Sequence, residues 1–182
     1  MDRTDLPPLA TRQELPDALT VLLHEFPRLR WTEHPNFGRL ADFWMQRHGM
    51  FRQLCGVLEQ DVIALQDKQM GFDAYAPRLS RFAGMLLNEL HGHHQIEDVH
   101  YFPKLSQLDP RLERGFDLLD ADHHSMDSLL HAMATGANGV LQGGEPGPFA
   151  DQLADFRRML FRHLEDEEDL IVPVMLKTGF SG

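Results

Sequence analysis

The sequence predicts an all-α protein, an antiparallel up-down-up-down four-helix bundle that carries an N-terminal extension. Four long segments show the hydrophobic period of amphipathic helices and contain few helix-breaking residues. Short connections separate these segments, and short connections place neighbouring helices antiparallel. The apolar stripe of each segment also holds one histidine near its middle, where a core hydrophobe is expected.

The extension covers residues 1–35, which hold five prolines and little sustained periodicity. We expect it to be partly helical, with a short helix over 18–26, and to wrap the bundle formed by residues 36–178. Periodicity places the four helices of the bundle. Their expected ranges are about 37–67, 74–102, 110–140 and 148–176.

Two of the expected helices repeat a motif, HHQIEDVHYFP from His93 and HLEDEEDLIVP from His163. Each copy has a glutamate four residues after its histidine, at Glu97 and Glu167, then a second acidic residue. A spacing of four puts histidine and glutamate on one helix face. Each copy also has a proline ten residues after the histidine, and we expect this proline to end the helix soon after the motif.

The other two helices each carry a lone histidine in the stripe, His48 and His123. In an antiparallel hairpin, residues equally far from the turn lie at the same height. The midpoint between His48 and His93 falls on the glycine turn near position 70. The midpoint between His123 and His163 falls on Gly143. The four histidines are therefore expected in one layer of the bundle.

Polar residues buried in one layer need a partner. Two ionised glutamates in a core without one cost on the order of several kcal/mol each. Coordination of two divalent cations removes that cost and adds folding energy. Imidazole plus carboxylate, without thiolate, favours iron, with manganese and zinc as possible substitutes. The sequence thus predicts a metal site formed by His48, His93, Glu97, His123, His163 and Glu167.

These residues resemble the hemerythrin-like (HHE cation-binding) family over about residues 37–176. The resemblance is carried by His48, by HQIE within HHQIED, by the DHHSMD stretch and by HLEDEE, in that order. It implies a non-haem centre of two Fe ions, bridged by oxide or hydroxide, with the four histidines as terminal ligands and both glutamates as bridges. It also implies a small diatomic ligand, O2 or NO.

The ligand pattern departs from that of the oxygen-carrying hemerythrins. Those proteins have a fifth histidine four residues after the third-helix ligand, where this chain has Asp127, and a final carboxylate at the position of Glu168. Four histidines with two glutamates are closer to the di-iron proteins that repair iron–sulfur clusters. Those proteins also carry a cysteine-bearing N-terminal region, which this chain lacks.

Other polar residues near the motifs are expected to face solvent. His91 and His94 flank the core face, and the charges of the second motif beside Glu167 are most simply solvated. The sequence leaves open whether the metals are touched by His124, Asp127, His100 or Glu168. Cys55 is expected to be a small buried packing residue.

The net charge of −11 argues against nucleic acid or an anionic membrane as partner. A single cysteine and the lack of a long apolar run favour a cytoplasmic protein. Three functions remain: binding or sensing of O2 or NO, or iron handling; an oxidoreductase or iron donor in oxidative or nitrosative stress defence; and a structural zinc or metal-free helical interaction module. No motif identifies a protein partner.

Overall fold

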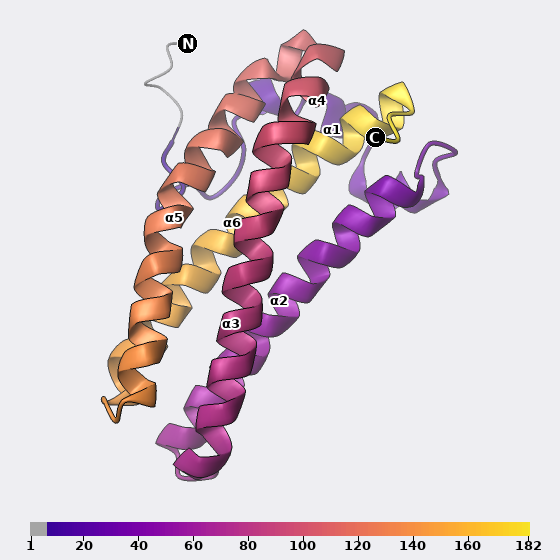
Figure 1. Ribbon diagram of the computed structural model, residues 1–182. Coiled ribbons are helices and arrows are strands. Elements are labelled where there is room, and N and C mark those ends of the chain that lie inside the picture. The colour runs from indigo at the N-terminus through magenta and orange to yellow at the C-terminus, as the bar shows by residue number, and fades with distance from the viewer. Residues whose placement is uncertain (1–6) are drawn as a thin grey trace.

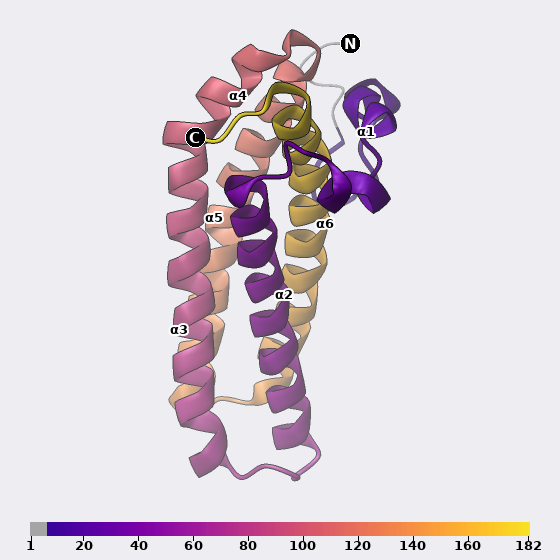
Figure 2. The same cartoon turned by 90° about the vertical axis from the view of Figure 1, so that its right-hand side faces the viewer.

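The computed structural model describes residues 7–182, and every regular element within that range is helical. This confirms the all-α prediction. Four long helices lie side by side in both views (Figure 1 and Figure 2), and they are α2 (Arg39–Gln66), α3 (Phe72–Ile96), α5 (Glu113–Leu141) and α6 (Pro146–Thr178). None of the helices in the described part of the chain is long and apolar enough to cross a membrane.

Short loops join the long helices in pairs. Residues 67–71 connect α2 to α3, and residues 142–145 connect α5 to α6. Gly143 has a φ of 92°, a left-handed conformation that glycine adopts without strain, and Pro146 follows in the first turn of α6. Helices α2 and α6 also pack together, as do α3 and α5, so the four helices enclose one shared interior.

The second long helix does not stop near residue 102 as expected. After α3 the backbone continues through one π-helical turn, η4 (Glu97–Tyr101), and then through α4 (Phe102–Leu108). The Phe102 N–H donates to the Glu97 carbonyl five residues earlier, and Pro103 lies in the first turn of α4. Proline is tolerated in the first turn of an α-helical segment, and Pro103 does not end the helix.

The expectation that a proline ends the last helix is also wrong. Pro173 lies inside α6, which runs on to Thr178 and ends at Gly179 in the left-handed conformation, with a φ of 69°. The third expected helix begins as a short 3-10 turn, η5 (Pro110–Leu112), where Asp109 accepts a hydrogen bond from the Arg111 N–H.

The N-terminal segment forms short helical pieces beside α6, namely η2 (Asp17–Leu19), α1 (Val21–Glu25) and η3 (Arg28–Glu33). The helix expected over 18–26 is thus interrupted at Thr20. Trp31 of η3 is buried against Val172 and Leu176 of α6, and its indole N–H donates to the Phe26 carbonyl.

Two apolar clusters fill the interior, one on each side of a polar layer. In α2, for example, Ala41 and Trp44 belong to one cluster, while Phe51, Cys55 and Leu58 belong to the other. Cys55 is fully buried, as expected for a packing residue, and burial raises the pKa of its thiol to about 12. The residues between the clusters build the candidate site.

Candidate metal centre

The four histidines predicted to share a layer meet in pairs between the two core clusters. The Nε2 atoms of His48 and His93 are 3.1 Å apart, and those of His123 and His163 are also 3.1 Å apart. Their side chains are nearly inaccessible, with His93 the most exposed at 9%. One histidine from each long helix therefore reaches the same cross-section of the interior.

The two glutamates lie between these pairs. Glu97 directs Oε1 to His93 Nε2 at 2.8 Å and Oε2 to His123 Nε2 at 3.6 Å. Glu167 directs Oε2 both to His48 Nε2 at 3.4 Å and to His163 Nε2 at 3.5 Å. Each carboxylate thus faces one histidine of each pair.

His94 joins this layer, although the sequence predicts it at the surface. It is 4% exposed, and its ring stacks on His123 with 3.9 Å between ring centres. Helical spacing alone does not distinguish His94 from His93. From Leu90, a step of four followed by one of three reaches Glu97 through His94, whereas the opposite order reaches it through His93. Both histidines therefore fit the same core stripe.

The candidate ligand atoms fall into two groups, each spanning at most 4.8 Å. We name them the two-histidine group (His48, His93, Glu97 and Glu167) and the three-histidine group (His94, His123 and His163). All members of both groups are buried.

Carboxylates hold the outer nitrogens of three of these histidines. The Nδ1 atom of His48 lies 2.9 Å from Glu168, that of His123 lies 2.7 Å from Asp98, and that of His163 lies 3.4 Å from Asp122. Such contacts fix the ring orientation and leave Nε2 directed inward, as in the outer shells of metal sites.

Glu168 and Asp166 were expected in solvent, yet both are buried, at 2% and 0% exposure. Arginines compensate them: Arg52 donates to Glu168 at 2.7 Å, and Arg12 donates to Asp166 at 2.7 Å. Burial alone would raise the pKa of Glu168, but its hydrogen bonds to His48 and Arg52 outweigh burial and lower the pKa.

The other residues left open by the sequence lie outside the layer. His100, His124 and Asp127 are exposed, as is His91. His124 hydrogen-bonds the Asp120 carbonyl on its own helix. None of these four belongs to either candidate group.

Buried polar atoms without hydrogen bonds mark where a cation fits. Among the described residues, these include both ring nitrogens of His94. Both carboxylate oxygens of Glu97 and Oε2 of Glu167 lie near histidine nitrogens but form no hydrogen bond with them. Burial raises the pKa of each glutamate to about 8 and lowers the pKa of His93 to about 4. A metal cation supplies the missing partner for these atoms and favours the ionised carboxylates and neutral imidazoles that bind it.

A cavity of about 420 Å³ between α2 and α3 reaches the two-histidine group. Its wall includes His93 and Glu97 together with aromatic and aliphatic side chains and an ion pair between Arg47 and Glu89 at 2.7 Å. The apolar and aromatic members of the wall are Phe43, Trp44, Ile96 and Tyr101. No member of the three-histidine group lines this cavity.

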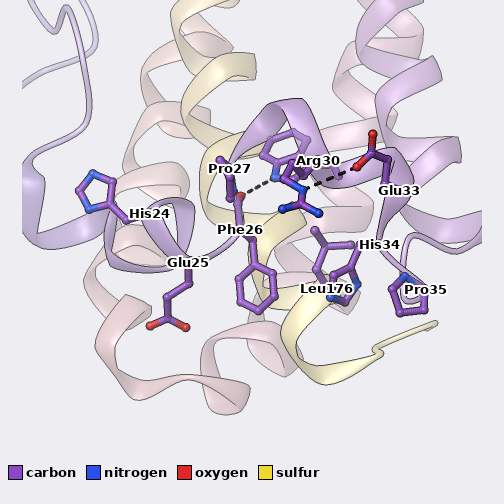
Figure 3. A pocket seen from close by; sticks show the side chains of 10 residues that line it. His24, Glu25, Phe26, Pro27, Arg30, Glu33, His34, Pro35 and Leu176 are labelled. Carbon is purple, nitrogen blue, oxygen red and sulfur yellow. Dashed lines mark hydrogen bonds and ion pairs between the residues drawn. The ribbon is translucent and has the colours of Figure 1, made fainter.

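A second cavity, of about 520 Å³, lies under the N-terminal segment and contains no candidate ligand (Figure 3). Its labelled side chains include His24 and Glu25 at one side and His34 near Leu176 at the other, with Arg30 paired to Glu33 at 3.6 Å. His24 is exposed, as expected from the sequence.

Comparison with known protein families agrees with this geometry. The family described as hemerythrin HHE cation binding domain matches residues 39–175, which contain both candidate groups in full. Comparisons with curated proteins and with solved structures give no match. The match covers well over half of the chain, so this protein belongs to the hemerythrin HHE cation-binding family.

Proposed function

We propose that the protein holds two iron ions between its helices and binds or senses O2 or NO there. The observation that carries this proposal is the convergence of five buried histidines and two buried glutamates whose inward atoms have few other partners. One ion would be held by the two-histidine group and the other by the three-histidine group, with Glu97 and Glu167 shared between them. Imidazole and carboxylate suit iron, with manganese and zinc as competitors.

The two groups supply different numbers of histidines, and this difference supports a binding role. The ion beside His48 and His93 would have one protein ligand fewer than its neighbour, so a small molecule could complete its coordination. The cavity between α2 and α3 opens on this group through His93 and Glu97. Bound iron would supply reversible redox and ligand-binding chemistry, while Trp44 orients Glu167 through its indole N–H, which donates to the carboxylate at 2.8 Å.

Iron content and gas binding test the proposal directly. We expect about two iron ions per chain by elemental analysis, and a change in absorbance when the reduced protein meets O2 or NO in a stopped-flow instrument. The double variant His93→Ala/His163→Ala should lose iron, whereas His24→Ala, at an exposed position, should not. A wild-type chain that retains its helicity and takes up zinc or no metal would support the structural module instead.

The size of the cavity favours a second candidate, an oxidoreductase of stress defence. A water molecule occupies about 30 Å³ in the liquid, so a cavity of about 420 Å³ has room for more than a diatomic gas. Peroxide or NO consumption by the iron-loaded protein would test this function. Many turnovers per chain would favour the enzyme, and a single stoichiometric reaction would favour binding or sensing.

A further inference from the structure

The segment of residues 7–16 is anchored against α5 and α6. Leu9 and Leu15 are buried in the two apolar clusters. Arg158 of α6 donates a hydrogen bond to the Ala10 carbonyl at 2.8 Å. The segment therefore has a defined position, from which one further side chain enters the protein interior.

That side chain is Arg12, whose guanidinium is fully buried between the two helices. Its Nε donates to Asp166 of α6 at 2.7 Å, and its Nη1 and Nη2 donate to the two oxygens of Asp122 of α5. Nη1 also donates to the Pro7 carbonyl at 3.0 Å. A guanidinium suits this place because its planar fork can bond two carboxylates at once.

Asp122 connects this arginine to the candidate metal layer. Its Oδ2 atom accepts from Arg12 and also lies 3.4 Å from the Nδ1 atom of His163. The opposite nitrogen of that ring, Nε2, faces His123 and Glu167. The position of Asp122 therefore sets which nitrogen of His163 points inward and at what angle.

We propose that Arg12 is a positioning residue of the metal centre, acting through Asp122 on His163 of the three-histidine group. The inference rests on the proposed metal binding and assigns a role to the N-terminal extension. Without Arg12, Asp122 and Asp166 would remain buried with less compensation, and Asp122 would no longer be fixed beside the histidine. The ion held by the three-histidine group would then be released more readily.

The extension supplies a second arginine that serves as a comparison. Arg28 donates to Asp169 at 2.6 Å and to Glu168 at 3.3 Å, but its side chain is 39% exposed. Glu168 also has Arg52, so its position beside His48 does not depend on Arg28. If a partly exposed arginine is lost, water can solvate the carboxylate that it contacted. A buried carboxylate that loses a buried arginine has no such compensation.

The experiment compares Arg12→Ala, Arg12→Lys and Arg28→Ala with the wild-type chain, each loaded with Fe(II) without oxygen. Iron per chain, the rate of iron release to a chelator, and helicity by circular dichroism are measured. We expect Arg12→Ala to release one of its two ions about 10- to 100-fold faster, the usual cost of losing an outer partner. Arg12→Lys should restore part of the retention, and Arg28→Ala should match the wild type because Arg52 still holds Glu168.

Two ions in Arg12→Ala with wild-type release would overturn the inference while leaving the proposed function intact. A wild-type chain that binds no iron would overturn both. If Arg12→Ala fails to fold, Asp122→Asn tests the inference instead. This variant keeps the side-chain size and removes the carboxylate beside His163. Accelerated release of one ion from Asp122→Asn supports the inference, and unchanged release sinks it.

Discussion

The two copies of the His–Glu motif share their spacing but not their local structure. The copy from His163 lies entirely within α6, whereas the copy from His93 passes at Glu97 from an α-helix into a π-helical turn. The second residue also differs, since His94 in one copy corresponds to Leu164 in the other, and both are buried. The first copy therefore offers three candidate ligands and the second offers two.

The acidic residue after each glutamate has the same partner type in both copies. Asp98 contacts the buried histidine of α5, His123, at 2.7 Å, and Glu168 contacts the buried histidine of α2, His48, at 2.9 Å. The surroundings differ: Glu168 is buried and bonded to Arg52, whereas the Asp98 side chain is 32% exposed. Each motif thus also orients a histidine of a neighbouring helix, and the copy in α6 does so more firmly.

Substitution of the glutamate in the π-helical copy should have the largest effect. Glu97→Gln removes the charge of a residue that faces both histidine pairs, so we expect bound iron to fall from two ions per chain towards none. Burial already raises the pKa of Glu97 to about 8, so the metal-free chain tolerates a neutral amide and keeps its helicity. Elemental analysis measures the loss, with Glu165→Gln on the exposed face of α6 as control. Two ions retained by Glu97→Gln would refute its bridging role.

His94→Leu makes the first copy resemble the second. We expect it to lose one ion, from the three-histidine group, and to keep the other, because the two-histidine group retains its members. His91→Leu, at an exposed position on the same helix, should keep both ions. Iron content and the visible absorbance of the oxidised protein report the change. Full iron content in His94→Leu would show that His94 packs in the core and is not a metal ligand.

The supporting carboxylates should rank by burial. We expect Glu168→Gln to weaken iron affinity by about 10- to 100-fold, and Asp98→Asn to weaken it less, because water can reach the half-exposed position. Competition with a coloured chelator measures both affinities. Equal losses, or a larger loss in Asp98→Asn, would contradict the comparison drawn from their surroundings.

The pH dependence of the metal-free chain should also report the burial of Glu97 and Glu167. Their pKa rises from 4.5 to about 8 on folding, so the folded state binds more protons and its stability falls as pH rises through about 8. His93, with its pKa lowered from 6.5 to about 4, stabilises above pH 6.5 and loses this contribution as pH falls through about 4.

Between about pH 6.5 and 8 the contribution of the two glutamates decreases while that of His93 stays constant, so the free energy of unfolding of the metal-free chain should decrease over that interval. Urea denaturation at several pH values measures it. The iron-loaded chain should show the opposite slope, because protons compete with the metal for the same atoms. A metal-free chain that becomes more stable from pH 6.5 to 8 would contradict the buried, uncompensated state of the glutamates.

Helical periodicity and hairpin midpoints were enough to predict which helices carry polar residues into one layer. They identified His48, His93, His123 and His163 because a period of 3.6 residues fixes the face of a helix. The same argument could not separate His93 from His94, since both fit the stripe. It also placed Glu168 in solvent, because periodicity does not reveal a neighbouring arginine.

Contacts made by irregular segments could not be predicted from the sequence. Arg12 reaches Asp122 across 110 positions and Asp166 across 154, from a segment without periodicity. No local pattern marks such a contact. The π-helical turn likewise differs from an α-helix by hydrogen bonds to carbonyls five residues back, such as that from the Phe102 N–H to Glu97, which is a small difference in backbone geometry.

Because Cys55 is buried, its reactivity reports separation of the bundle helices. Cys55 is the chain's single cysteine and lies two helical turns after His48, and a thiol with a pKa of about 12 hardly reacts at neutral pH. An alkylating reagent will therefore modify it only in molecules whose helices have come apart. Mass spectrometry of alkylated protein would count such openings, one adduct per chain, and would compare loaded with stripped protein without any engineered label.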